Sequence, residues 1–203
     1  MYHSKPTKIN ISPAAVVLLA AFIWLTSAAL LASLLLAALC HELGHYAALR
    51  RLGVRVSEVR ISVMGAEMKM AGRGLSYGGE MLAVAAGPAV NLILAPILAA
   101  VGRYCPVLYL FAGAQLVLGV FNLLPVRPLD GGTLLWLITA RFTDPFLADR
   151  ISRIVNKGVG AALLGAAVYL WRVGGSPFLL MSAAGLLFYS AAEKGLVKRA
   201  RKG

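Results

Sequence analysis

Two histidines and a glutamate form the pattern HELGH at the end of a long apolar run, as His41, Glu42 and His45. On a helix, residues four apart lie on one face and one turn apart, so both imidazoles can reach the same ion. In HExxH sites the histidines bind zinc, and the glutamate takes a proton from the water that the metal activates. The pattern therefore predicts a zinc site, and because so short a pattern also recurs by chance, its setting has to support it.

A third ligand is expected among the carboxylates, since His3, the remaining histidine, lies in the polar N-terminal segment. Asp130 follows an apolar run in the segment NLLPVRPLDGG. The prolines of this segment remove backbone donors, and its glycines allow turns that interrupt a helix. Broken backbone at membrane depth is tolerated where it lines a cavity or is buried in protein. Asp130 can therefore complete a His₂Asp set that leaves a fourth position for water.

Both features also have a plainer interpretation. The HELGH residues could be hydrated side chains at the membrane interface, and NLLPVRPLDGG could be an ordinary helix end followed by a loop. Against this, a charged side chain at a helix centre in the bilayer costs at least about 2.5 kcal/mol, so such groups usually have a partner. Cys40 precedes His41 but points about 100° away from it around the helix, which excludes it as a ligand of the same ion.

The composition excludes an ordinary soluble domain. Of the 203 residues, 60% are apolar and 14% are charged, and the mean hydropathy is +0.79. A fold of this size cannot hide so much hydrocarbon from water, so lipid must be the solvent for much of the chain. The net charge is +12, but the basic residues lie between apolar runs without interleaved aromatics, which favours topology determinants over nucleic-acid binding. The two cysteines are expected to be free thiols.

The apolar runs predict an all-α polytopic membrane protein with about six transmembrane helices, a small β-hairpin or sheet after the second, and a single domain over residues 1 to 203. The run from Pro13 to Leu39 is long for one span and short for two, so we split it near Thr26. Polar and β-branched residues that alternate between glycine-rich turns indicate the hairpin, and KINIS near the N-terminus can add a strand. The expected helices cover residues 13 to 26, 28 to 51, 80 to 101, 105 to 124 with a broken extension to 140, 158 to 173 and 177 to 193, with the hairpin region at 53 to 80 and a loop at 141 to 157.

The basic residues also predict an orientation, because cytoplasmic segments of membrane proteins collect Lys and Arg. With the N-terminus inside, six helices place every Lys and Arg except Arg103 and Arg172 on one side. Five helices, with residues 13 to 39 as a single span, move only Lys5 and Lys8 to the other side. Both layouts put HELGH toward the cytoplasmic face.

Taken in order, HELGH, GPAVN and NLLPVRPLDGG resemble the site-2 protease family of intramembrane zinc metalloproteases. The three motifs span residues 41 to 132, about half of the chain. The compact layout, in which we expect neither a PDZ-like insertion nor a CBS-like domain, is most similar to the branch that contains stage IV sporulation protein FB. The resemblance implies that His41, His45 and Asp130 bind Zn²⁺ and that Glu42 is the acid/base.

The same resemblance places Asn122 and Asn91 near the site, where they would orient the substrate or stabilise an oxyanion. For Asn91 a simple packing role stays equally open. The expected function is hydrolysis of peptide bonds in membrane-spanning or membrane-associated proteins, in a bacterial cell membrane and with the active site toward the cytoplasm. The expected partners are a membrane protein substrate and the lipid bilayer, with no nucleic acid; the substrate, the activating signal and the oligomeric state do not follow from the sequence.

Three alternatives remain at this stage. A transporter or channel would also carry intramembrane ionisable residues, but it does not explain the HExxH spacing. A zinc-binding membrane scaffold that does not cleave is opposed by the intact Glu42. A different HExxH peptidase would need a glutamate as third ligand, and the distant candidates, Glu80 and Glu193, do not lie in a comparably broken segment.

Overall fold

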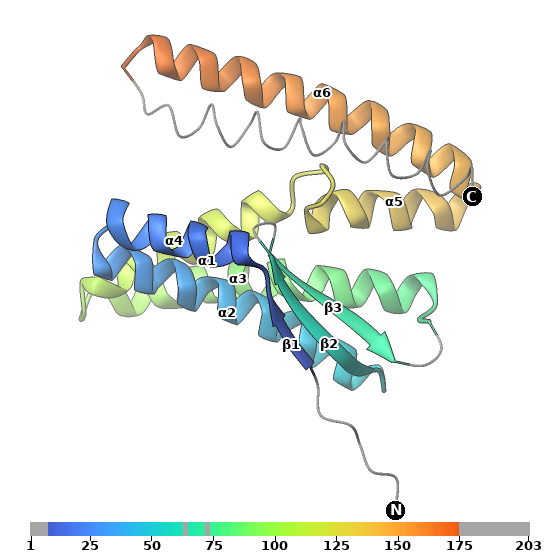
Figure 1. Cartoon of the computed structure of the whole chain (residues 1–203), viewed down its shortest axis with the longest axis horizontal. Helices are drawn as coiled ribbons and strands as arrows, with labels where there is room; N and C mark the ends of the chain where they lie inside the picture. The colour runs from blue at the N-terminus through green and yellow to red at the C-terminus, as the bar shows by residue number, and fades with distance from the viewer. Residues whose placement is uncertain (1–7, 63–64, 72–73, 175–203) are drawn as a thin grey trace, which may run out of the picture. The chain divides into compact units, whose positions relative to one another are not determined.

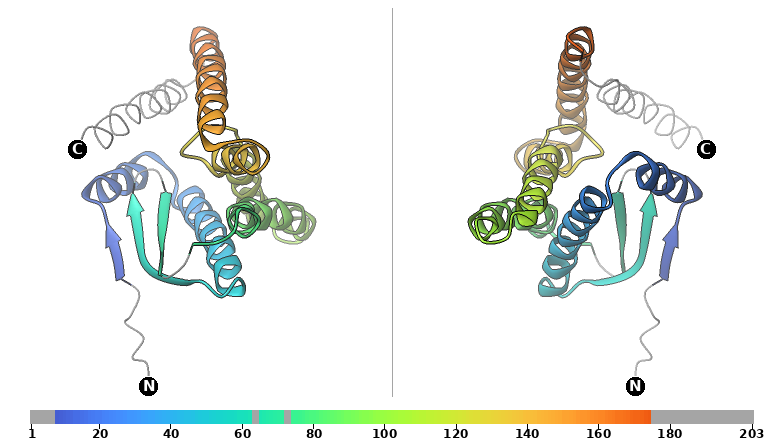
Figure 2. Two further views of the ribbon diagram at one scale, coloured as in Figure 1. Left: turned by 90° about the vertical axis from the view of Figure 1, so that its right-hand side faces the viewer. Right: turned by 90° about the vertical axis from the view of Figure 1, so that its left-hand side faces the viewer.

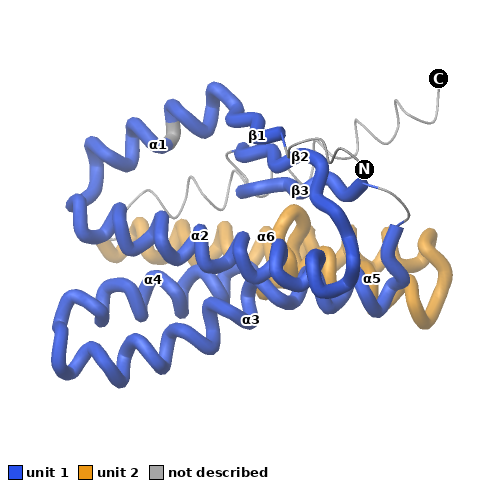
Figure 3. Tube along the Cα trace, turned by 90° about the horizontal axis from the view of Figure 1, so that it is seen from below, with its two compact units in different colours: residues 1–122 blue, residues 123–203 orange. Residues whose placement is uncertain are grey.

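The computed structural model describes residues 8–62, 65–71 and 74–174, and it is helical apart from three strands (Figure 1). The chain forms two compact units, residues 1–122 and 123–203, which Figure 3 shows in different colours. Unit 1 contains β1 (Lys8–Ile11), α1 (Pro13–Leu25), α2 (Ala28–Arg51), β2 (Arg55–Ser62), β3 (Gly65–Ala71), α3 (Tyr77–Gly102) and α4 (Val107–Asn122). Unit 2 contains α5 (Asp130–Phe142) and α6 (Pro145–Arg172).

The apolar run after Pro13 divides into two helices, as the sequence predicted, because serines begin both of them. The Ser12 side chain caps α1 by accepting from Ala15 N at 3.2 Å, and Ser27 caps α2 by accepting from Leu30 N at 3.3 Å. A serine oxygen at these positions satisfies a backbone N–H that has no partner within the helix. α2 therefore starts afresh at Ala28 and continues without a break through HELGH to Arg51.

The three strands form one sheet in the order β1, β2, β3, with β1 parallel and β3 antiparallel to β2 (Figure 2). The expected hairpin is thus β2 and β3, and the KINIS segment supplies β1. A bulge between Val56 and Glu58 shifts the register, so that Val56 and Val59 both face the protein interior. There they pack with Leu49 of α2 and Ala83 of α3, which ties the sheet to the helices beside it.

Helices α2, α3 and α4 pack through small residues. A side chain at Gly44 of α2 would meet Ala86 O at 2.7 Å, and one at Gly119 of α4 would meet the Asn91 side chain at 3.0 Å. Small residues let backbones approach closely where lipid supplies little hydrophobic drive for helix association. Large apolar side chains point outward instead, as Trp24, at 90% exposure, illustrates. Small residues inside and large apolar side chains outside are the distribution expected for a protein surrounded by lipid.

The predicted loop over residues 141 to 157 is wrong, because α6 begins at Pro145 and runs through that segment. Asp144 caps the helix by accepting from Leu147 N at 2.9 Å, and proline is well tolerated at the first helical position. The helix is amphipathic here: Ala148, Ser152 and Asn156 are buried on one face while basic residues lie on the other. The helix expected at 158 to 173 is only the second half of α6.

Within the described residues, three helices are long and apolar enough to cross a membrane, namely α2, α3 and α6. The apolar helices α1 and α4 are shorter. These helices and the small sheet confirm a mostly helical protein that fits a membrane. The sixth expected helix, at 177 to 193, lies outside the described residues, so the number of spans stays a prediction, as does the single domain.

Candidate metal centre

The two histidines of HELGH point the same way from adjacent turns of α2. His41 is buried, His45 is partly buried, and their Nε2 atoms lie 3.1 Å apart. The rings meet edge to face, with their planes at 85°. Zinc–nitrogen bonds of about 2.0 to 2.1 Å in tetrahedral geometry place two ligating nitrogens roughly 3.3 Å apart. The two Nε2 atoms therefore have the separation of two ligands on one zinc ion.

The other nitrogen of each ring makes a hydrogen bond inside unit 1. His45 Nδ1 lies 2.8 Å from Ala83 O, and His41 Nδ1 lies 2.6 Å from Asn91 Oδ1. Both partners are oxygens that can only accept, so each Nδ1 carries the hydrogen and each Nε2 keeps its lone pair. Two lone pairs directed at each other at this distance repel unless a cation lies between them. This is the outer arrangement typical of zinc-ligating histidines.

The orientation of the Asn91 amide is set by its own donors. Asn91 Nδ2 donates to Ala37 O at 3.1 Å and to Gln115 Oε1, and both acceptors lie in unit 1. Because both amide hydrogens have acceptors, the oxygen is the atom that faces His41. The structure thus places Asn91 behind a proposed ligand, and its predicted contact with substrate or oxyanion stays untested.

GPAVN begins with Gly87, which makes room for His45. A Cβ atom at Gly87 would lie 2.3 Å from His45 Nε2, far inside van der Waals contact. The ring of His45 occupies the space where any other residue of α3 would carry its side chain. The glycine of GPAVN therefore shapes the candidate metal centre by leaving space for the His45 ring.

Glu42 points from α2 toward the sheet. Its Oε1 accepts from the backbone N–H of Ala66 at 3.3 Å, at the beginning of β3. This contact holds one carboxylate oxygen beside the first residues of the edge strand, one helical position from His41. The predicted acid/base thus lies where the helix that carries the histidines meets the sheet.

In unit 2, Asp130 is the first residue of α5 and is partly buried. The turn before it is very tight, since a Cβ atom at Gly131 would lie 2.1 Å from Leu123 O and one at Gly132 would lie 2.4 Å from Arg127 N. The Arg127 backbone N–H also donates to Asn156 Oδ1 of α6 at 3.1 Å. These contacts hold the NLLPVRPLDGG segment against itself and against α6, and so set the start of α5.

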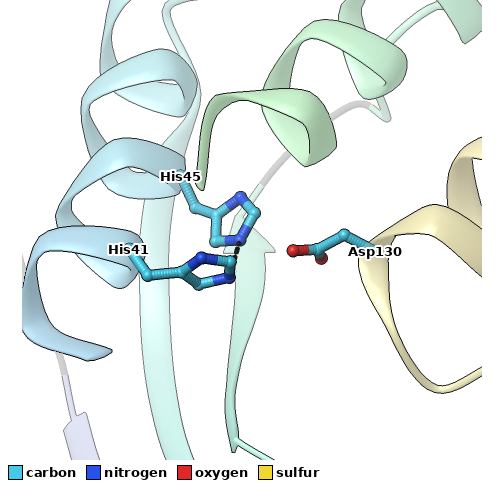
Figure 4. Close-up of side chains that lie close together, drawn as sticks. All are labelled: His41, His45 and Asp130. Atoms are coloured by element: carbon cyan, nitrogen blue, oxygen red, sulfur yellow. Dashed lines mark hydrogen bonds between the residues drawn. The ribbon is translucent and has the colours of Figure 1, made fainter. Parts of the chain in front are cut away.

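Figure 4 shows His41, His45 and Asp130 with their side chains directed toward one another. One nitrogen of each histidine and one carboxylate oxygen of Asp130 all lie within 4.8 Å of one another. Two imidazoles and a carboxylate are the donor set of many zinc sites that keep a position for water. The group fits zinc, as the sequence predicted.

Asn122 ends α4 and is partly buried. Its Nδ2 donates to Leu118 O of its own helix at 3.0 Å, so its predicted role toward the substrate stays a prediction. Sequence reasoning missed Gln115 and the Ala83 carbonyl. Gln115 is the only amide in the apolar run 107–121, which is a signal that could have drawn attention to it. A backbone carbonyl carries no signal in a sequence.

Comparison with known proteins agrees with these observations. The model of peptidase family M50 matches residues 29–107 and 104–166. The Rip3 protein of Mycobacterium tuberculosis is 33% identical over 157 residues, which are 72% of this chain and 38% of that protein. A zinc metalloprotease of Methanocaldococcus jannaschii is 28% identical over 131 residues, which are 61% of this chain and 38% of that protein.

The fold also has a counterpart among solved structures. The site-2 protease from Methanocaldococcus jannaschii superposes with a TM-score of 0.70 at 23% identity, covering 95% of this chain and 93% of that one. At this identity the likeness concerns the fold. The chain belongs to peptidase family M50, and the resemblance drawn from its three motifs is confirmed. It spans about two fifths of the length of the curated relatives it matches.

Proposed function

We propose that this chain is a zinc-dependent endopeptidase that hydrolyses peptide bonds of membrane-spanning or membrane-associated proteins within the bilayer. The observation that carries the proposal is the convergence of His41, His45 and Asp130, from segments far apart in the sequence, within 4.8 Å. The membership of family M50 and the names of relatives such as the zinc metalloprotease of Methanocaldococcus jannaschii support it. A transporter, or a zinc-binding scaffold that does not cleave, would not need this donor set together with an adjacent glutamate.

The ligands and the acid/base have separate roles in the proposed reaction. His41, His45 and Asp130 would hold zinc, which would supply a Lewis acid able to activate water and polarise the scissile carbonyl. Glu42 accepts the proton of the attacking water on its carboxylate and returns it to the leaving amine. Asn122 donates an amide hydrogen to the oxygen on which charge develops.

Strand β3 supports a role for the sheet in substrate binding. It is an edge strand, and a substrate helix has to unwind before its carbonyls can be attacked. An unwound segment could pair with the edge of β3 that faces away from β2. The Ala66 N–H points away from β2 to Glu42, so an incoming strand on this edge would lie next to the acid/base.

The proposed location is a bacterial cell membrane, with the metal centre toward the cytoplasm. Lys8 pairs in register with Glu58, so the start of α1 and the sheet after α2 lie on one side of unit 1. This pairing favours the six-helix layout, in which α1 and α2 form a hairpin and the basic N-terminal residues stay inside.

The proposal is tested by incubating the purified protein in nanodiscs with a panel of single-span membrane proteins, with and without a zinc chelator. Cleavage that stops with chelator and returns with zinc is expected. Glu42→Gln should lose cleavage by at least about a hundredfold, at the lower end of what general acid–base groups contribute, while its zinc content stays that of the wild type. Glu58→Gln on the outer side of the sheet is the matched control and should cleave normally. Full cleavage by the Glu42 variant, or ion flux without cleavage, would reject the proposal.

The role of β3 is tested with Met68→Pro. Successive residues of a strand direct their N–H groups to opposite sides, so the Met68 N–H points to the same outer edge as that of Ala66. Proline there removes a donor for the incoming strand and leaves the bonds to β2 in place. We expect cleavage of helical substrates to fall about tenfold with zinc affinity unchanged, reflecting the loss of one hydrogen bond of the strand pairing. Met68→Ala is the control, because it removes the same side chain from the hydrophobic cluster and keeps the backbone N–H. Equal rates for the two variants would exclude edge pairing.

A further inference from the structure

A chain of buried amides joins the first histidine to α4. The His41 ring donates from Nδ1 to Asn91 Oδ1 at 2.6 Å, and Asn91 Nδ2 donates to Gln115 Oε1. His41 is 6% exposed, while Asn91 and Gln115 are both fully buried at 0%. Three helices, α2, α3 and α4, thus contribute one member each to a continuous line of hydrogen bonds.

The direction of these hydrogen bonds is fixed by Ala37. The Ala37 carbonyl can only accept, so the nitrogen side of the Asn91 amide has to face α2 at that point. The second hydrogen of the same nitrogen then meets Gln115, which must present its oxygen. Rotation of the Asn91 amide by half a turn would break both bonds and place a donor against His41 Nδ1.

The Gln115 side chain buries a hydrogen-bond donor that has no acceptor in the described part of the chain, which is unfavourable in free energy. Its Oε1 is used by Asn91, whereas Nε2 is buried and has no hydrogen-bond acceptor among the residues that the structure describes. An apolar side chain of the same size would fill this position without burying an unsatisfied donor. The backbone at Gly119, one turn further along α4, approaches so closely that a Cβ atom there would lie 3.0 Å from the Asn91 side chain. One face of α4 is therefore shaped around Asn91.

We propose that Gln115 is a positioning residue for the zinc ligand His41 and that it acts through Asn91. By holding the second amide hydrogen of Asn91, Gln115 favours the amide orientation that presents Oδ1 to His41. That orientation keeps the hydrogen of His41 on Nδ1 and its lone pair on Nε2, the atom beside His45. Without Gln115, only Ala37 opposes rotation of the amide, and the tautomer that cannot ligate becomes more populated. This inference rests on the proposed function, since it assigns a role toward the same metal.

The test compares Gln115→Met with Gln115→Glu in the full chain, purified in detergent and stripped of metal. Methionine keeps the volume and loses the acceptor, whereas glutamate keeps the acceptor. Zinc affinity is measured by competition with a fluorescent chelator, and Co²⁺ absorption reports the geometry of the loaded site. We expect the Met variant to bind zinc about tenfold more weakly, the lower end of the range for outer partners of zinc ligands, with an altered Co²⁺ spectrum. The Glu variant should stay within about threefold of the wild type, since the bond to Asn91 is retained.

Leu116→Met, at the exposed neighbouring position, is the matched control and should leave zinc affinity unchanged. Methionine and glutamate both keep the volume of glutamine, so a purely steric role for Gln115 predicts wild-type zinc affinity in both variants. That result, or a Glu variant that binds zinc more weakly than the Met variant, would overturn the inference. If the Met variant does not fold, the Glu variant decides, because a tenfold loss of affinity in it contradicts the proposal. A wild type that binds zinc without cleaving any substrate rejects the proposed function and leaves the affinity comparison valid.

Discussion

A single methyl group at position 87 would collide with His45, a proposed zinc ligand. The Cβ atom of Gly87→Ala would lie 2.3 Å from His45 Nε2, and a ring held by Ala83 O at 2.8 Å has little freedom to move aside. We expect zinc affinity to fall about 10- to 100-fold, in line with overpacking costs and with the loss of outer partners. The measurement is competition with a chelator in detergent.

Gly113→Ala is the control for that prediction. Gly113 lies in α4, and a Cβ atom there would meet nothing within 4 Å. An added methyl in a helix reduces backbone freedom in the unfolded chain, so this variant should bind zinc normally and melt at an equal or slightly higher temperature. Equal zinc affinity of the two variants would show that Gly87 does not set the position of the His45 ring.

At the residue scale, local spacing predicted which side chains share one face of a helix. It did not predict contacts between different helices. The proposal of His41 and His45 as ligands came from their separation of four residues, and that of Asp130 from the broken backbone around it. Gln115 could not be predicted, because its role depends on how α4 packs against α3. The role of Gly87 was equally hidden, since nothing in GPAVN tells which side chain from another helix fills the space.

Among the elements, the turn before α5 positions Asp130, the proposed carboxylate ligand. Gly131→Ala would place a Cβ atom 2.1 Å from Leu123 O, and because that atom is backbone the segment has to shift. We expect a loss of about 1 to 3 kcal/mol in unfolding free energy, typical of overpacking, together with weaker zinc binding as Asp130 moves. Thermal melting of metal-free protein separates the first effect from the second, which chelator competition reports.

Gly165→Ala in α6 is the matched control for Gly131→Ala. A Cβ atom at Gly165 meets nothing within 4 Å, so alanine should stabilise the helix by about 0.5 to 1 kcal/mol. A Gly131 variant that melts and binds zinc like this control would mean that the turn tolerates a side chain and does not fix Asp130.

At the element scale, the length of an apolar run predicted a helix boundary correctly, whereas polarity predicted a loop that is absent. The run from Pro13 to Leu39 was split near Thr26, and α2 does begin at Ala28. The polar stretch 141 to 157 was assigned to a loop because its charged residues interrupt the apolar pattern. Asp144 followed by Pro145 is itself a helix start, and the charges lie on one face of an amphipathic helix whose other face is buried. Parallel pairing of β1 with β2 joins distant segments, which local sequence patterns do not reveal.

For the whole molecule, the pairing of β1 with β2 predicts on which side of the membrane the N-terminal segment lies. Lys8 and Glu58 are register partners, so both must lie on the side of the sheet. Helix α3 leads from the sheet to Cys105, and its 26 residues rise roughly 39 Å at about 1.5 Å each, more than the bilayer core of about 30 Å. Cys105 is exposed and should therefore lie on the opposite side from Lys8 and the sheet.

Cysteine labelling in intact cells tests this arrangement. In a Cys40→Ala background, native Cys105 should react with a membrane-impermeant maleimide added outside. Lys8→Cys and Lys69→Cys, each in a variant that also carries Cys105→Ser, should react only after the membrane is permeabilised. Labelling at Lys69 shows on which side of the membrane the sheet and the proposed metal centre lie. Labelling at Lys8 distinguishes two membrane passes over residues 13 to 51 from a single pass. Labelling of the Lys8 variant from outside, with the Lys69 variant protected, would favour the single span and contradict the pairing of β1 with β2, because one strand cannot lie across the membrane from its neighbour.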